Sequence, residues 1–222
     1  FPLHFAFSFD EEIGCRAAGR IGEFVTRQGW NPRLAIIGEP TLMQPVTAHK
    51  GIYSFVTTIT GKEAHSSQTQ IGVNAIAYAT RLISKLQDLA TQAQTRRDDR
   101  FTPPYSTVQV GIIQGGTARN IVPAHCRFEW EIRPIPQDDP PQELDDFFAF
   151  QQQLHQEIQL REESCGIDTQ PASRVTSLKP ETDQTLQHLM LHLAESNHLN
   201  AVAYGTEAGI LQSHGIPCFI CG

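Results

Sequence analysis

Apolar residues near the start of the chain follow strand-like and helix-like spacings in turn. Residues 2–9 and 34–38 are short apolar runs, and each predicts a strand. Between them, apolar residues at helical spacing predict a helix over about 15–28. One face of this helix carries Ala17, Ile21, Phe24 and Val25. A strand, a helix and a strand in this order predict a βαβ unit within a parallel sheet.

The pattern changes from Gly51 onward. Apolar or β-branched residues at Tyr53, Phe55, Thr57 and Ile59 alternate with smaller or polar ones, which is typical of a sheet with one covered face. A long amphipathic helix over about 73–97 follows. Its apolar stripe consists of Ile76, Ala79, Leu82, Ile83, Leu86, Leu89 and Ala90.

A hairpin, a second helix and a last strand come next. A strand that carries Val108, Val110 and Ile112, a turn at Gly115-Gly116 and a strand over 126–132 predict the hairpin. Asp138-Asp139 followed by Pro140-Pro141 predicts the start of the helix. Its inward face is expected to carry Leu144, Phe147, Phe148, Leu154 and Ile158. Residues 167–175 supply the last strand.

The order of elements predicts the fold class. Strand, helix, strand, strand, helix, strand over roughly 51–175 is the ferredoxin-like arrangement. After Pro180, a helix to about Asn197 and a strand near 201–204 return to the earlier βα pattern. We therefore predict an α/β protein. One domain, residues 1–50 and 176–222, has a mostly parallel sheet with flanking helices, and an inserted α+β domain spans 51–175.

Composition and charge narrow the classes of function. The formal net charge of the 222 residues is −7, and no basic run is longer than Arg96-Arg97, which argues against nucleic-acid binding. No apolar run approaches the ~20 residues that a membrane-spanning helix needs. Five cysteines, an odd number, are not typical of a secreted disulfide framework. We expect a soluble, cytoplasmic protein that acts on small molecules and, because no Met opens the chain, an internal part of a longer one.

Carboxylates follow two of the predicted strands. Glu11 and Glu12 come where the strand over 2–9 ends, and Glu39 comes where the strand over 34–38 ends. Open α/β sheets bind ligands outside the carboxyl ends of their strands, so these side chains are expected to converge. Clustered carboxylates repel one another unless they are protonated or neutralised by a cation. A metal site is therefore the leading hypothesis.

Adjacent residues on an extended chain point to opposite sides, so Glu11 and Glu12 are expected to do different work. One can bind a metal ion while the other accepts a proton from metal-bound water, which is hydrolytic chemistry. The alternative is that the glutamate pair opens a helix, where acidic residues are favoured by the helix dipole. Glu39 weakens this alternative, because it also follows a strand but needs no helix dipole to explain it, since Pro40 comes directly after it.

Two other segments carry polar residues at the ends of strands. His65 lies in a loop after the first strand of the inserted domain, and its simpler interpretation is a solvated histidine. Thr206 and Glu207 follow a predicted strand of the first domain, so they are expected to reach the same sheet edge as Glu11 and Glu39. The simpler interpretation is a strand-to-helix turn capped by the threonine.

Other candidate motifs favour structural roles. His49 and His125 have no carboxylate neighbour in sequence and are expected to be structural or exposed. The loop 115–120 joins antiparallel strands and lacks the Walker lysine, so it is not a phosphate loop. Cys218 and Cys221 belong to a predicted buried strand without a second cysteine pair, which excludes a complete zinc site there.

Five segments together, in this order, resemble the M20 family of dinuclear zinc amidohydrolases and peptidases. They are FSFDEEIG at 7–14, IGEPT at 37–41, GKEAHSS at 61–67, GGTARNIVP at 115–123 and YGTEAG at 204–209. The resemblance covers nearly the whole chain. It implies that the first domain is catalytic and binds metal, and that the inserted domain is a lid through which two copies dimerise.

The resemblance also implies roles for individual residues. Glu11 resembles the general base, and Glu12 and Glu39 resemble ligands of two different zinc ions, which Co²⁺ or Mn²⁺ can replace. His65 resembles a lid histidine that steadies the oxyanion in the partner's site. Asn120 and Arg133 resemble lid residues that hold the amide and the carboxylate of the substrate. Thr206 and Glu207 are further candidates for contacting the substrate. The family's upstream His-x-Asp pair and C-terminal His are expected beyond these 222 residues.

Within the family, the closest resemblance is to the acetylornithine deacetylases. It implies hydrolysis of the N-acetyl amide of N2-acetyl-L-ornithine to ornithine and acetate, a step of arginine biosynthesis. Alternatives within the family are desuccinylation of succinyl-diaminopimelate and cleavage of other N-acyl amino acids or dipeptides. An alternative of another class is a non-catalytic binding or assembly module that keeps the fold.

Overall fold

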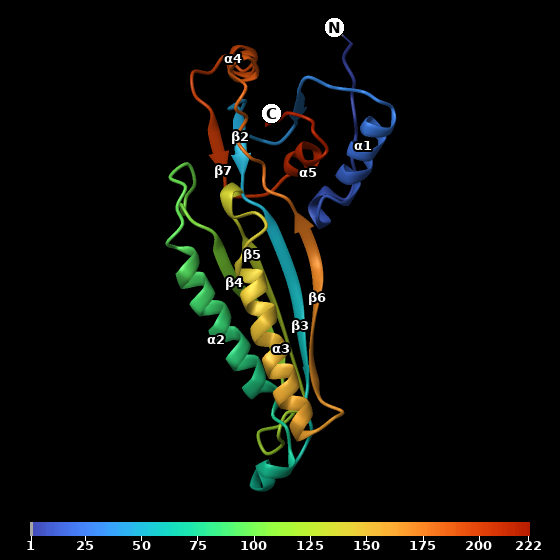
Figure 1. Ribbon diagram of the computed structural model, residues 1–222, viewed down its shortest axis with the longest axis vertical. Coiled ribbons are helices and arrows are strands. Elements are labelled where there is room, and N and C mark those ends of the chain that lie inside the picture. The colour runs from blue at the N-terminus through green and yellow to red at the C-terminus, as the bar shows by residue number, and fades with distance from the viewer. Residues whose placement is uncertain (1) are drawn as a thin grey trace.

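The computed structural model describes residues 2–222, which form two four-stranded sheets at opposite ends of an elongated molecule (Figure 1). We call residues 52–175 the antiparallel region, and residues 2–49 together with 176–222 the mixed-sheet region. Two chain segments join the regions, one around 49–52 and one around 175–178, and they pair with each other through a bridge between His49 and Leu178. We call these two segments the crossover. The site candidates are distributed between both regions.

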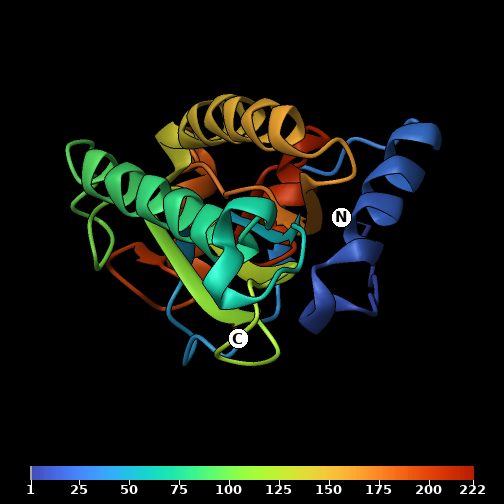
Figure 2. The same cartoon turned by 90° about the horizontal axis from the view of Figure 1, so that it is seen from below.

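The antiparallel region has the strand order β4-β5-β3-β6, with antiparallel pairing throughout. Its strands are β3 (Ile52–Thr60), β4 (Thr107–Gly115), β5 (His125–Arg133) and β6 (Gly166–Val175). Its helices are α2 (Ala75–Ala93) and α3 (Glu143–Arg161), with the short turns η2 (Ser66–Ile71) and η3 (Pro136–Asp138). Figure 2 shows both helices over the same face of the sheet. The predicted order of elements is confirmed.

The predicted alternation along β3 is also confirmed, because the side chains of Tyr53, Phe55, Thr57 and Ile59 are all buried. Along β4 the alternation breaks after Val110, where the pairing with β5 shifts register. Ile112 lies opposite Glu129, on the other face from the core, and is 46% exposed. A bulge inserts one residue and so turns the following side chains over.

The start of α3 differs from the prediction. Asp138 and Asp139 do not cap the helix, which begins at Glu143 after Gln142. Asp138 accepts hydrogen bonds from Arg96 and Ser106, each at 2.8 Å. These tertiary contacts compete with local capping, and a sequence pattern contains no information about them.

The mixed-sheet region has the strand order β1-β8-β2-β7. Its elements are η1 (Glu11–Ile13), α1 (Arg16–Arg27), β1 (Ala35–Ile37), β2 (Val46–His49), α4 (Gln184–Leu193), β7 (Asn200–Val202), α5 (Ala208–Ser213) and β8 (Cys218–Ile220). β1 runs parallel to β8, and β2 runs parallel to β7, but β2 is antiparallel to β8. Two of these three pairings are parallel, as the sequence predicts for most of the sheet, and the single antiparallel pairing makes the sheet mixed.

The predicted strand over 2–9 is wrong, since these residues form no strand in the structure. Leu3, Phe5, Phe7 and Phe9 are between 61% and 92% exposed. The pattern detected apolar alternation correctly, but a strand forms only where a partner edge satisfies its backbone groups.

Among the described residues, no helix combines the length and apolar character needed to cross a membrane.

Candidate functional site

The first two glutamates lie in a tight turn and not on an extended strand. Glu11 and Glu12 open the 3-10 turn η1, and the flanking Asp10 and Cys15 have left-handed φ angles of 64° and 54°. Gly14 closes the turn at φ 104°, where a side chain would be strained. The helix α1 begins only at Arg16, with no acidic residue in its first turn. The glutamate pair therefore does not serve as the acidic start of a helix.

Glu39 lies just beyond the end of β1, as predicted. The loop that carries it is held by the end of the neighbouring strand, because Thr41 N donates to the carbonyl of Gly222 at 2.8 Å. Burial raises the pKa of Glu39, and the negative charges of Glu11, Glu207 and Glu12 raise it further. These four carboxylates therefore share one neighbourhood.

Glu207 reaches this neighbourhood by a route that differs from the prediction. β7 runs opposite to β8, and hence opposite to β1, so its end does not lie at the same sheet edge as Glu39. The residues after β7 carry Glu207 back toward the other carboxylates. Glu207 is 7% exposed, and its Oε2 accepts a hydrogen bond from Ser8 Oγ at 2.7 Å. Its buried Oε1 has no protein partner among the described residues.

A buried thiol borders the carboxylates. Cys15 Sγ lies 3.7 Å from Glu11 Oε1, with hydrogen-bonding geometry. Burial raises the pKa of Cys15 to about 12, and the charges of Glu11, Glu207 and Glu39 add to the shift. The thiol therefore stays protonated and donates to the carboxylate.

The negative charge of the four clustered carboxylates suits a divalent cation. A cation would offset the repulsion that Glu39 experiences and would satisfy the free oxygen of Glu207. The four carboxylates do not form a complete ligand set by themselves. Across residues 2–222, no three His, Cys, Asp or Glu side chains are arranged to hold one ion.

A second group of predicted residues lies at the far end of the molecule. His65 pairs with Ile121 in a β-bridge, and Ser66 N donates to the carbonyl of Asn120 at 2.9 Å. The His65 ring is exposed, and its Nδ1 lies 2.8 Å from Ser67 Oγ. His65 and Asn120 are thus neighbours at the tip of the antiparallel region.

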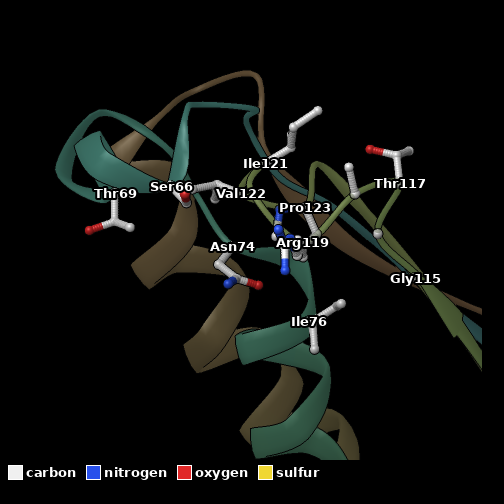
Figure 3. A pocket seen from close by; sticks show the side chains of 12 residues that line it. Ser66, Thr69, Asn74, Ile76, Gly115, Thr117, Arg119, Ile121, Val122 and Pro123 are labelled. Atoms are coloured by element: carbon white, nitrogen blue, oxygen red, sulfur yellow. The ribbon is translucent and has the colours of Figure 1, made fainter.

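A hollow of about 540 Å³ lies beside these residues (Figure 3). It is bounded by Ser66 and Thr69 of η2, by Asn74 at the start of α2, and by the loop that follows Gly115. Arg119 points into the space between Asn74 and Pro123 (Figure 3). None of the four clustered glutamates lines this hollow.

The two groups lie at opposite ends of the long axis. η2, next to His65, forms the lower end of Figure 1, and β1, which precedes Glu39, lies near the upper end. Within one chain, His65 and Asn120 therefore do not reach Glu11. Arg133 belongs to neither group. It ends β5 near the crossover and pairs with Glu131, with Nε 2.8 Å from Oε1.

Comparison with known families now identifies the chain. Residues 47–157, half of its length, match the M20 family's model for the peptidase dimerisation domain. The chain belongs to the M20 peptidase family. The match begins in β2 and ends within α3, so it covers most of the antiparallel region, including the tip with His65 and Asn120.

Relatives in the M20 family cover the rest of the chain. An acetylornithine deacetylase of Myxococcus xanthus is 32% identical over all 222 residues, which correspond to 56% of that protein. An acetylornithine deacetylase of Proteus mirabilis is 40% identical over 136 residues, which are 61% of this chain and 34% of that protein. The chain thus spans about half the length of the Myxococcus relative and about a third of the Proteus relative.

Solved structures confirm the M20 fold. The aminopeptidase PepT of Bacillus cereus superposes with a TM-score of 0.70 at 20% identity, over 97% of this chain and 54% of that one. The YXEP protein of Bacillus subtilis, described as a dinuclear metal binding peptidase from the M20 family, gives a TM-score of 0.56 at 16% identity, over 95% and 52% of the two chains. At these identities the likeness concerns the fold alone.

Three residues near the site were not predicted from the sequence. Ser8 and Cys15 contact Glu207 and Glu11 respectively, and the buried His49 contacts the turn after Glu207. Ser8 and Cys15 lie within or next to the FSFDEEIG segment, which is the only sequence signal that could have drawn attention to them. His49 carries no such signal, because its partner Gly209 is 160 residues away.

Proposed function

We propose that this chain is part of an enzyme that hydrolyses the N-acetyl amide of N2-acetyl-L-ornithine to ornithine and acetate, in arginine biosynthesis. The observation that carries the proposal is the 32% identity over the whole chain to a relative named acetylornithine deacetylase. The family assignment and the four carboxylates in one neighbourhood support hydrolysis as the type of reaction.

Metal binding is part of the proposal. Glu12 and Glu39 would hold zinc ions, two in a complete site, with Co²⁺ or Mn²⁺ as possible substitutes. Zinc supplies Lewis acidity, which lowers the pKa of a bound water to about 7. Burial raises the pKa of Glu39 and repulsion from Glu11, Glu207 and Glu12 raises it further, and this repulsion supports a cation at this place. Further ligands are proposed to come from parts of the enzyme outside residues 1–222.

Glu11 is the proposed general base. Its carboxylate takes a proton from the attacking water, whose oxygen forms a bond to the acetyl carbon. The same carboxyl group then gives the proton to the departing nitrogen as the C–N bond breaks, which yields acetate and the free amine. The thiol of Cys15 lies 3.7 Å from Glu11 Oε1 and supports the orientation of this carboxylate.

Substrate contacts come from three places. Glu207 is one of the four clustered carboxylates, and Thr206 precedes it directly in sequence; both are proposed to contact the substrate. Asn120 is proposed to hold the amide, and His65 to stabilise the oxyanion. Arg133 is proposed to bind the substrate carboxylate, for which it must exchange its present partner Glu131.

Dimerisation makes these contacts possible, because His65 and Asn120 lie far from Glu11 in the same chain. We propose a homodimer in which the tip of one lid reaches the partner's site. The lid would be residues 51–175, and the catalytic domain residues 1–50 and 176–222. The dimerisation-domain match supports this, and so does β4, an edge strand with exposed Ile112 and Ile113 that can pair with a second copy. A cytoplasmic location, which five buried unpaired cysteines support, completes the proposal.

A substrate panel tests the function. The full-length enzyme, purified with zinc, is assayed against N2-acetyl-L-ornithine, N-succinyl-diaminopimelate, N-acetyl-methionine and a dipeptide. The acetylornithine reaction is expected to have the highest kcat/KM. Faster turnover of the succinylated substrate or of the dipeptide would refute the assignment within the family, and no turnover of any of them would favour a non-catalytic module.

A further inference from the structure

His49 is a fully buried histidine at the junction of the two regions, and the proposed reaction does not use it. It ends β2, and its side chain is 0% exposed. Its backbone pairs with Leu178 in both directions, at 3.3 Å and 3.2 Å between nitrogen and oxygen. His49 therefore lies where the two segments that join the regions run side by side.

Both ring nitrogens of His49 have backbone partners, and together they define its tautomer. Gly209 N lies 3.2 Å from Nε2 and can only donate, so Nε2 carries no proton. Nδ1 lies 2.8 Å from the carbonyl oxygen of Lys50, which can only accept, so Nδ1 carries the proton. The ring is neutral, and burial lowers its pKa to about 4.

Gly209 belongs to the first turn of α5, two residues after Glu207. It packs so closely on the crossover that an added Cβ would lie 2.0 Å from the carbonyl oxygen of Thr176. Thr206, on the other side of Glu207, is fully buried, and its Oγ1 accepts from Ala208 N at 3.1 Å. The turn that carries Glu207 is thus attached to the crossover by a backbone contact and by the His49 imidazole.

We infer that His49 is a positioning residue, whose neutral imidazole joins the crossover to the Thr206–Glu207 turn and so sets where the Glu207 carboxylate lies among Glu11, Glu12 and Glu39. A residue that only fills space does not need a hydrogen-bond acceptor at Nε2, and this difference makes the inference testable. The consequence for turnover rests on the proposed function, because it assumes that Glu207 contacts the substrate.

Two isosteric substitutions separate the functions of the two ring nitrogens. H49Q places a carboxamide oxygen near the position of Nε2 and keeps an acceptor for Gly209. H49N places its carboxamide near Nδ1, keeps a donor for Lys50 and loses the acceptor. Both variants are made in the full-length enzyme, with metal content and hydrogen exchange of the Gly209 amide as measurements that need no substrate.

We expect Gly209 exchange to accelerate about tenfold in H49N, the equivalent of one lost hydrogen bond, and to stay near wild type in H49Q. The KM for the panel's best substrate should rise about tenfold in H49N, with kcat within about threefold of wild type, and H49Q should restore it. Metal content should be the same in all three proteins.

Equal Gly209 exchange in H49N and H49Q, or faster exchange with no change in KM, would overturn the inference. If H49N does not fold, the wild-type enzyme still decides, because ¹⁵N chemical shifts distinguish the two neutral tautomers. A proton on Nδ1 supports the inference, and a proton on Nε2 overturns it. Since the exchange and tautomer measurements need no substrate, a wrong assignment of the substrate would leave them unaffected.

Discussion

The antiparallel region and the mixed-sheet region build their cores differently. The strands of the antiparallel region are nine or ten residues long, and one continuous cluster of buried side chains lies between its sheet and α2 and α3. The strands of the mixed-sheet region have three or four residues, and their buried side chains divide into smaller clusters. The clustered glutamates belong to the second region.

The difference separates stability from chemistry. The antiparallel region is one uninterrupted stretch of sequence, and its main cluster of buried side chains lies wholly within residues 52–175. The mixed-sheet region is assembled from both ends of the chain, and it leaves Phe5, Phe7 and Phe9 exposed. Substitutions in the continuous core of the first region should therefore change the free energy of unfolding, whereas substitutions among the glutamates should change the reaction.

The largest effect is expected at Glu11. Glu11→Gln in the full-length enzyme should lower kcat about 10²- to 10⁴-fold, because it removes the proton acceptor, while metal content stays the same. Glu39→Ala is the matched variant and should lower metal content, measured by atomic emission after dialysis. If Glu11→Gln emptied the site and Glu39→Ala left it full, the two roles would be exchanged.

Phe128→Ala should lower the free energy of unfolding by about 3–5 kcal/mol, because Phe128 is fully buried in the antiparallel core and its removal leaves a cavity. Phe7→Ala is the control. Phe7 is 92% exposed, so its effect should stay within about 0.5 kcal/mol. Urea unfolding measures both. Similar losses for the two would contradict the contrast between the regions.

Acid should weaken the attachment of the Thr206–Glu207 turn to the crossover. The pKa of His49 is lowered from 6.5 to about 4, chiefly by burial, while the backbone of Lys50, the charge of Asp139 and the backbone of Thr206 oppose the shift. Between pH 6.5 and pH 4 the unfolded chain binds a proton at His49 that the folded chain does not bind. The stability that comes from the neutral, hydrogen-bonded His49 is therefore full above about pH 6.5 and is lost as pH falls toward 4. The loss is at most roughly 3 kcal/mol. Unfolding of wild type and H49Q from pH 7 to 4 measures it, and parallel curves would contradict it.

Thr57→Val tests a buried hydrogen bond within the antiparallel core. The indole nitrogen of Trp130 donates to Thr57 Oγ1 at 2.9 Å, and Thr57 is fully buried. The substitution keeps the shape but leaves the indole N–H without this acceptor, which should cost about 1–3 kcal/mol. Thr58→Val, on the opposite face of β3, is the control and should change stability by less than about 0.5 kcal/mol. Equal changes in thermal unfolding would contradict the prediction.

The smallest effect is expected for the ion pair between α2 and α3. Arg81 donates to Glu157 through its two terminal guanidinium nitrogens, at 2.6 Å and 2.8 Å, but both side chains are nearly half exposed. Arg81→Ala should therefore cost only about 0.2–1 kcal/mol, and less at high salt. The hydrogen bonds from Arg81 lower the pKa of Glu157, so this contribution is present above its ordinary pKa and is lost as pH falls below it. A loss unchanged by 1 M salt would contradict a screened surface pair.

Local pattern was enough to predict most of the antiparallel region. The periodic apolar residues of β3 and α2 identify elements of nine and nineteen residues, long enough for the signal to exceed chance. The same reasoning predicted a strand at residues 2–9 that has no partner, and it did not detect β2, whose sequence VTAH has only one large apolar side chain. Strand pairing depends on distant partners, so short strands are the least predictable elements.

The candidate site shows the same division. The sequence by itself determined the types of residue, the order of the five motifs and hence the M20 family. Only the tertiary structure decided that Glu11, Glu12, Glu39 and Glu207 share a neighbourhood, and that His65 and Asn120 lie at the other end of the molecule. It also decided that His49, 160 residues before Gly209, contacts it. Residue type is a local property of the chain, but proximity between distant residues exists only after the strands have paired and the crossover has formed.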